Sequence, residues 1–62
     1  MLVVFKDTNG DELAVESTMV KELGTSVVNG ETWIYTSDGR QIRVVGRVSE
    51  VAAALNGEVP NG

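Results

Sequence analysis

Residues 32–45 read TWIYTSDGRQIRVV, and this stretch decides the fold. Two runs rich in β-branched and aromatic residues flank Asp38-Gly39, a pair that is typical of a tight hairpin turn. A turn of two residues would place Trp33 directly opposite Val44 on the neighbouring strand. The face that this pairing predicts as the core consists of Val28, Trp33, Tyr35, Ile42 and Val44.

Turn signals also divide the rest of the chain into short apolar segments. Asn9-Gly10 and Asn29-Gly30 are further pairs of the kind that tolerates the positive φ of a hairpin turn. The segment 17–23 has a second interpretation as a helical turn, because its apolar residues recur at helical spacing. The predicted strands are Leu2–Lys6, Glu12–Glu16, 21–28, 31–37 and 40–46.

The C-terminal part changes to a helical pattern. Ser49 is a suitable N-cap, Glu50 suits the positive end of a helix dipole, and 51–55 is rich in alanine. Gly57 stands where a C-terminal cap residue belongs. We therefore expect one β-rich domain over 1–57 and a flexible tail over 58–62. The expected fold is mainly β: a curved antiparallel sheet or small open barrel of about five strands with one short C-terminal helix.

The composition argues against an enzyme and against a cofactor. The chain has 62 residues with no cysteine and no histidine, so a Ser-His or Cys-His nucleophile pair cannot be built within it. We expect no bound cofactor and no metal site. The segment 7–12, DTNGDE, resembles the first half of a calcium loop, but Glu12 stands where that loop needs glycine. We interpret the segment as a hairpin turn with solvated acids.

Charge and hydropathy limit the partners and the compartment. The net charge is −4, which argues against binding to a long nucleic acid, since that requires a basic surface. No segment approaches the ~20 apolar residues of a transmembrane helix, and the N-terminus does not fit a signal peptide. We therefore expect no membrane partner and a cytoplasmic location.

The face opposite the expected core suggests self-association. A solvent-facing strand alternates more strictly between apolar and polar residues than these strands do. An apolar patch on that face would be a partner surface, and a domain this small gains support from a second subunit. We expect a homo-oligomer that also binds a protein partner. The patch consists of Val27, Ile34 and Val45.

The basic residues suggest a second hypothesis, a site for a small anionic ligand. Arg40, Arg43 and Arg47 lie in a segment without acids, and an arginine fork can grip phosphate. Trp33 and Tyr35, one strand away, could stack on a nucleotide base. The alternative stays open that the arginines are ordinary surface residues and that the two aromatic residues are core.

Two longer segments, NGDELAVE (9–16) and TWIYTSDGRQIRVVGRVSEVAAAL (32–55), carry a resemblance to a known family. The chain resembles the small FlbD-type proteins encoded among flagellar genes, over about residues 1–55. Trp33, the arginine cluster and the neutral alanine-rich helix depart from that family's pattern. The resemblance implies a strand-rich fold with a C-terminal helix and a non-catalytic accessory role, with no catalytic residues to carry over.

These observations lead to two functional hypotheses. The first is a non-enzymatic, self-associating interaction or adaptor module. The alternative is an oligomeric phage-type sponge protein that sequesters a small phosphate-bearing ligand such as a nucleotide signal. The alternative rests on an analogy of size and acidic charge with small viral proteins, so a viral protein is part of that hypothesis.

Overall fold

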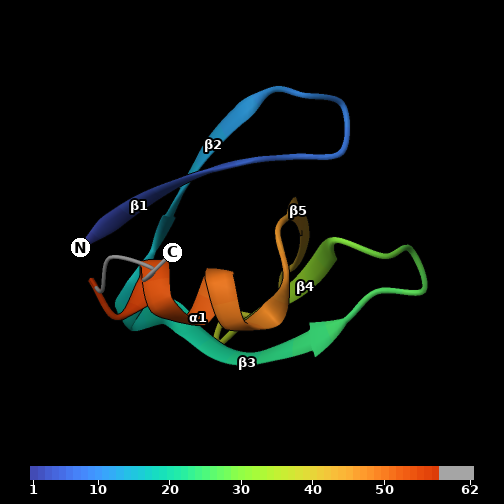
Figure 1. Ribbon diagram of the computed structural model, residues 1–62. Helices are drawn as coiled ribbons and strands as arrows, with labels where there is room; N and C mark the ends of the chain where they lie inside the picture. The colour runs from blue at the N-terminus through green and yellow to red at the C-terminus, as the bar shows by residue number, and fades with distance from the viewer. Residues whose placement is uncertain (58–62) are drawn as a thin grey trace.

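The computed structural model describes residues 1–57, and the predicted tail, 58–62, lies outside the described residues (Figure 1). The prediction of a mainly β fold with about five strands and a short C-terminal helix is confirmed. The elements in chain order are β1 Leu2–Lys6, β2 Glu12–Glu16, the 3-10 turn η1 Ser17–Met19, β3 Val20–Thr25, β4 Glu31–Thr36, β5 Gln41–Val45 and α1 Val48–Leu55.

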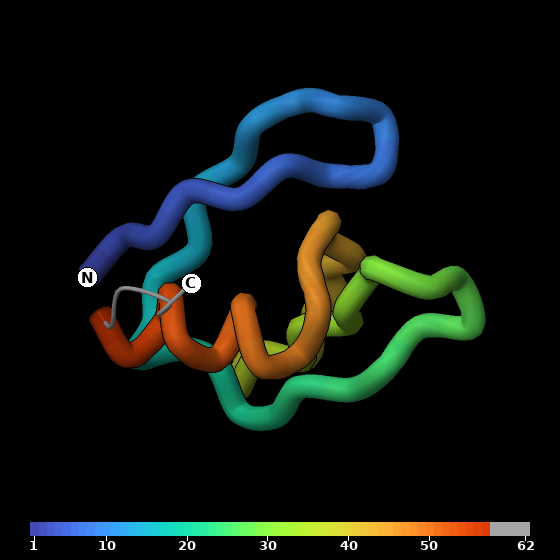
Figure 2. The backbone as a smooth tube through the Cα atoms, in the orientation of Figure 1, coloured from blue at the N-terminus to red at the C-terminus, as the bar shows by residue number. Residues whose placement is uncertain are grey.

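The strands form two antiparallel sheets. β1 pairs with β2 in a hairpin, and β3, β4 and β5 form a second sheet in that order. A single bridge between Asp7 and Val44 connects the two sheets. Figure 2 shows the β1–β2 hairpin arching over α1, which lies along the sheet that contains β3. Among residues 1–57 the strands therefore do not close into a barrel.

The third strand is shorter than predicted and begins earlier. It runs over Val20–Thr25 instead of 21–28, and the helical turn considered for 17–23 is present only as the 3-10 turn Ser17–Met19. The chain leaves the sheet after Thr25, because the connection to β4 is a five-residue loop and not a two-residue turn. Val28 is consequently 47% exposed and is not part of the core.

The helix begins before the predicted Ser49 cap. Arg47 is the N-cap residue, and its backbone N–H donates to Glu50 Oε1 over 3.0 Å, which satisfies one of the unpaired donors at the helix start. Ser49 lies inside the first turn. At the other end Gly57 takes a φ of 74° and donates its N–H to the Ala54 carbonyl, so the predicted C-terminal cap is confirmed.

The β4–β5 turn is one residue longer than expected, and this changes the core. The Gly39 N–H donates to Thr36 O over 3.1 Å, and the Thr36 N–H donates to Arg40 O over 3.0 Å, so the loop contains three residues. No non-glycine residue among 1–57 has a positive φ, which excludes the type I′ turn that a two-residue loop favours. Trp33 therefore pairs with Arg43, and Ile34 pairs with Ile42.

A shift of one residue moves every side chain of a strand to the other face. The prediction that Trp33 and Tyr35 are core residues is therefore wrong: both are half-buried on the opposite face, and Ile34 is completely buried. The prediction that Val44 belongs to the core is correct. The buried hydrophobic core consists of Phe5, Val15, Ile34, Val44 and Val51, with Thr32 and Thr36 buried beside it.

One core residue attaches the helix to both sheets. Val51 is 1% exposed and belongs to the same cluster as residues from β1, β2, β4 and β5. The chain reaches it through Gly46, whose φ of 132° is accessible only to glycine and whose added Cβ would lie 3.4 Å from Val51 Cγ2. The helix and the hairpin therefore both cover the face of the β3–β4–β5 sheet that carries Ile34.

Candidate binding surface

The other face of the β3–β4–β5 sheet, called the outer face here, carries the chemistry that the sequence singled out. Its register places Trp33 beside Arg43, Tyr35 beside Gln41, and Glu31 beside Val45. On β3, Gly24 pairs with Trp33 and Glu22 pairs with Tyr35. No helix or strand among residues 1–57 packs over this face, since α1 and the hairpin contribute to the core on the other side. The outer face consists of Glu22, Gly24, Glu31, Trp33, Tyr35, Gln41, Arg43 and Val45.

Arg43 is fixed in the middle of the outer face by two neighbours. Its guanidinium carbon lies 5.4 Å from the centroid of the Trp33 ring, which is within the range of a cation–π interaction. Its Nε lies 3.4 Å from Glu31 Oε1, an oxygen that is buried and accepts no hydrogen bond from residues 1–57. Arg43 therefore balances a half-buried carboxylate, and at the same time covers part of an aromatic ring.

Tyr35 is held close to the backbone of β3. A Cβ added to Gly24 would lie 3.2 Å from Tyr35 Cε2, so the ring occupies the space that any larger residue at 24 would need. A glycine inside a strand often marks such a close approach. The two aromatic side chains and Arg43 consequently form one ordered, half-buried group on an open sheet face.

The three arginines do not come together within one chain. Arg40 lies in the β4–β5 turn, where its Nε is 3.0 Å from Asp38 Oδ2. Arg43 is paired with Glu31 on the outer face. Arg47 lies at the corner between β5 and α1 and forms no ion pair with residues 1–57. Within residues 1–57, two of the arginines are thus paired with carboxylates and Arg47 is not, and the three form no shared phosphate cradle.

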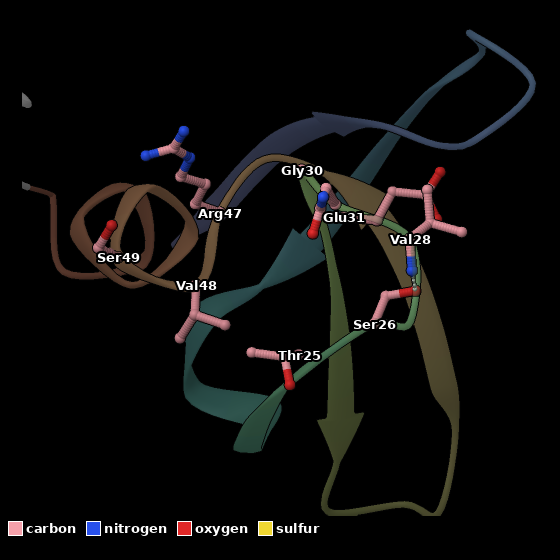
Figure 3. Close-up of a pocket in the computed structure, with 9 residues that line it drawn as sticks. Thr25, Ser26, Val28, Gly30, Glu31, Arg47, Val48 and Ser49 are labelled. Carbon is pink, nitrogen blue, oxygen red and sulfur yellow. Dashed lines mark hydrogen bonds between the residues drawn. The ribbon is translucent and has the colours of Figure 1, made fainter.

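Arg47 borders a groove in which it could meet a ligand. The groove lies between the start of α1 and the loop after β3, as Figure 3 shows. In that view the Arg47 side chain extends away from Thr25, while Val48 points toward Thr25 across the groove. The groove is open, and its polar lining from 25 to 31 comprises the hydroxyls of Thr25 and Ser26, the Asn29 amide and the Glu31 carboxylate.

The predicted self-association patch is not formed as expected. Ile34 is completely buried in the core, so it cannot face a partner. Val27 is fully exposed in the loop after β3, and Val45 is 53% exposed at the end of β5. Of the three predicted residues, only Val45 lies on the outer face.

The sequence analysis missed a second apolar surface, on the β1–β2 hairpin. Leu2 and Val4 are 68% and 60% exposed, and Ala14 pairs with Val4 across the hairpin. The signal was the continuous apolar run 2–5, in which Val3 and Phe5 face inward while Leu2 and Val4 face outward. The side chains of this surface are smaller than those of the outer face, and none of them is aromatic.

The Asp7–Glu12 segment is a turn and not a cation loop. Asp7 Oδ1 accepts hydrogen bonds from the Asn9 N–H at 2.9 Å and the Asp11 N–H at 3.0 Å. The Asp7 carboxylate is therefore used to close the hairpin, as the interpretation of a plain turn requires. Over residues 1–57 the acidic side chains form no group that could hold a metal ion.

Asp38 organises the β4–β5 turn. Its carboxylate accepts a hydrogen bond from the Thr36 hydroxyl and pairs with Arg40. The Thr36 hydrogen bond, followed by the positive charge of Arg40, lowers the pKa of Asp38 below its usual value of 3.8. The N-terminal amine, bonded to the Glu16 carboxylate, lowers the pKa of Glu16.

Within residues 1–57, no helix has the length and apolar character needed to cross a membrane. Comparison with known proteins gives no match to a family model, a curated protein or a solved structure.

Proposed function

We propose that this chain is a non-enzymatic interaction module that associates with copies of itself through the outer face and serves as an adaptor for a protein partner. One observation carries the proposal: Trp33, Tyr35 and Arg43 lie side by side on a sheet face that no other described element covers. These are the residue types that are enriched in protein interfaces and in their energetic hot spots. The resemblance to FlbD-type proteins implies a similar accessory role and stays a prediction.

The small size of the domain favours association with a second copy over an isolated monomer. A chain of about 60 residues buries only about 60% of the surface that its unfolded form exposes, so its stability is marginal. Covering the half-buried aromatic rings with a second copy would remove further apolar area from water. In a two-fold arrangement, Arg43 of one subunit would meet the same face of the other, where Glu22 offers an opposite charge. A cytoplasmic location is part of this proposal, because a chain without cysteine needs no oxidising compartment.

The test compares two valine-to-lysine variants at exposed positions. Val45→Lys puts a charge on the outer face, and Glu31 directly opposite keeps the isolated subunit folded by pairing with it. Val27→Lys makes the same chemical change in the loop, where the side chain is fully exposed and off this face. Native mass spectrometry and sedimentation across a concentration series should find an oligomer for the parent protein and for Val27→Lys. Val45→Lys should dissociate at concentrations about tenfold higher or more, equivalent to about 1.4 kcal/mol.

Two results would contradict self-association through this face. One is a parent protein that remains monomeric throughout the series. The other is equal dissociation constants for the two lysine variants, with circular dichroism confirming that both are folded.

The second candidate is the phage-type oligomeric sponge for a small phosphate-bearing ligand. The observation that favours it is the exposed guanidinium of Arg47, which forms no ion pair with residues 1–57 and lies beside the groove at the start of α1. An oligomer could place several copies of Arg47 near one another, which a single chain does not do. Titration of Trp33 fluorescence with linear and cyclic nucleotides tests it. We expect Arg47→Ala to abolish a response that Arg40→Ala, which removes an already neutralised arginine, leaves intact. No response from the parent protein to any nucleotide would reject this candidate.

A further inference from the structure

We propose that Asn29 is a site of spontaneous deamidation, and that the fold selects it over the other two asparagine-glycine pairs within residues 1–57. The described residues contain three such pairs, Asn9-Gly10, Asn29-Gly30 and Asn56-Gly57. A fourth, Asn61-Gly62, lies outside the described residues. Asparagine is among the chemically labile residue types, and glycine as the next residue offers the least steric hindrance to the reaction.

The reaction is a ring closure followed by hydrolysis. The backbone nitrogen of Gly30 attacks the side-chain carbonyl carbon Cγ of Asn29, a new N–C bond forms, and the bond to the side-chain nitrogen breaks. The backbone proton leaves with that nitrogen as ammonia, and a five-membered succinimide remains. Water then opens the ring at either carbonyl and gives aspartate or isoaspartate. One water enters and one ammonia leaves, so the reaction needs no oxidant, reductant or enzyme.

The attacking nitrogen must lose its proton, and a hydrogen bond from that N–H restrains it. In two of the three pairs the glycine N–H is engaged: Gly10 donates to Asp7 O and Gly57 donates to Ala54 O, each over 3.1 Å. The Gly30 N–H donates to no acceptor within residues 1–57. Gly30 is held instead through its carbonyl, which accepts from the Gly46 N–H at 2.6 Å. Of the three described pairs, only the Asn29 pair therefore presents a free nucleophile.

The surroundings of Asn29 also permit the movement that ring closure requires. Both residues of the pair are exposed, and Val27 beside them is fully exposed. Two of the hydrogen bonds that close this loop are long, 3.3 Å from Glu31 N to Val28 O and 3.4 Å from Ser26 N to Glu31 O, whereas the bond from Gly46 N to Gly30 O is short, at 2.6 Å. In the Asn9 turn the asparagine itself is restrained, because Asp7 Oδ1 accepts from both the Asn9 and the Asp11 N–H. Among the three described pairs, a loosely closed loop and a free glycine N–H coincide only at the loop after β3.

The product would alter the groove beside α1. Asn29 lines that groove together with Arg47 and Ser49. Deamidation adds a carboxylate there, near the positive end of the α1 dipole and near the positive charge of Arg47, so the added charge is favourably placed. The chain becomes more negative by one unit than its present −4. An isoaspartate also adds one carbon to the backbone of the loop.

The experiment follows each pair separately in the folded protein. The protein is incubated at neutral pH, digested with trypsin under mildly acidic conditions, and analysed by mass spectrometry. Cleavage after lysine and arginine puts Asn9 in peptide 7–21, Asn29 in 22–40, and Asn56 in 48–62 together with Asn61, which fragmentation separates. We expect conversion of Asn29 to be several times faster than that of Asn9 and Asn56. In urea the three rates should converge, because the sequence pair is the same.

A glutamine variant provides the matched control. Asn29→Gln lengthens the side chain so that the five-membered ring cannot form, and it should remove the deamidated species of peptide 22–40 that mass spectrometry detects after incubation. Asn9→Gln should leave that species in place. Equal rates for Asn9 and Asn29 in the folded protein, or persistence of deamidated peptide 22–40 in Asn29→Gln, would overturn the inference. The rates measured in the parent protein decide the question even if a variant fails to fold.

Discussion

Ile34 and Tyr35 are neighbours on β4, yet they lie on opposite faces of the sheet and have different surroundings. Ile34 is completely buried among Val44, Val51 and the hairpin side chains, whereas Tyr35 is half-buried beside Gly24 on the outer face. The larger aromatic side chains of β4 are thus outside, and the smaller β-branched ones are inside. A side chain of β4 is therefore buried when it lies on the face that α1 and the hairpin cover, whatever its size.

The buried threonines explain how the inner face accepts polar residues. The Thr32 hydroxyl donates to Gly46 O over 2.7 Å. The Thr36 hydroxyl donates to the Asp38 carboxylate and accepts from the Arg40 N–H over 3.0 Å. A buried hydroxyl is tolerated when it is hydrogen-bonded, so both residues combine a β-branched shape with satisfied polar atoms. The inner face consequently stabilises the fold and also fixes the two ends of β4.

The largest expected change in the free energy of unfolding comes from truncating one side chain on each face of β4. Ile34→Ala should lower the free energy of unfolding by about 2–5 kcal/mol, because it removes buried methyl groups and leaves a cavity. A domain of this length has roughly 3–9 kcal/mol of stability in total, so the variant should lose a large share of it. Trp33→Ala should cost less, about 1–2 kcal/mol, since its ring is half-buried and its contact with Arg43 is of cation–π strength.

Urea denaturation followed by far-UV circular dichroism measures both values. If Ile34→Ala is unfolded without denaturant, that result itself shows the larger loss, and Ile34→Val, with an expected cost of about 0.5–1.5 kcal/mol, gives a measurable value for the inner face. A larger loss for Trp33→Ala than for Ile34→Ala would mean that the two faces of β4 have been assigned in reverse.

The sequence predicted the elements well and the register of one hairpin badly. The first two strands, the C-terminal helix and its Gly57 cap follow from local patterns, because turns and caps depend on a few adjacent residues. The β4–β5 register depends on whether Asp38-Gly39 occupies the middle of the turn or its end. Gly39 takes the positive φ of 88° at the end of a three-residue loop, which the residue pair alone does not distinguish.

The candidate site was predictable in its members and not in its geometry. Trp33, Tyr35 and Arg43 were identified from their residue types, and they lie together on the outer face. The expected group of Arg40, Arg43 and Arg47 does not form. Arg40 pairs with Asp38 and Arg43 pairs with Glu31, and these pairings depend on the turn and on the register. Ile34 was assigned to the wrong surface for the same one-residue reason.

A smaller effect should come from Gly24, where the outer face meets the backbone of β3. Gly24→Ala should destabilise the protein by about 1 kcal/mol, because the new Cβ lies within 3.2 Å of the Tyr35 ring and forces it to move. In a Tyr35→Ser background the same substitution should become stabilising by about 0.5–1 kcal/mol, the usual gain of replacing glycine in a strand.

The four proteins of this double-mutant cycle would be compared by thermal and urea unfolding. The change of sign is the diagnostic result, because it isolates the contact from the backbone effect. A stabilising Gly24→Ala in the presence of Tyr35 would mean that the ring is not held against β3, and that the outer face is less ordered than the geometry indicates.

The smallest expected effect is a change in the pKa of Asp38, whose turn joins the buried Thr36 on the inner face to the exposed Arg40. The Thr36 hydroxyl is the leading cause that lowers the pKa of Asp38, and Arg40 is the second favourable one. A carboxyl group whose pKa is lower in the folded state than in the unfolded state stabilises the fold above the unfolded pKa of about 3.9, and this contribution is lost as the pH falls through the folded value.

Carboxyl chemical shifts followed by NMR during a pH titration report the Asp38 pKa directly. Thr36→Val should raise it toward its usual value by more than Arg40→Ala does, while Thr36→Ser, which keeps the hydroxyl, should leave it low. If Arg40→Ala has the larger effect, the exposed ion pair governs the turn, and the buried Thr36 on the inner face does not.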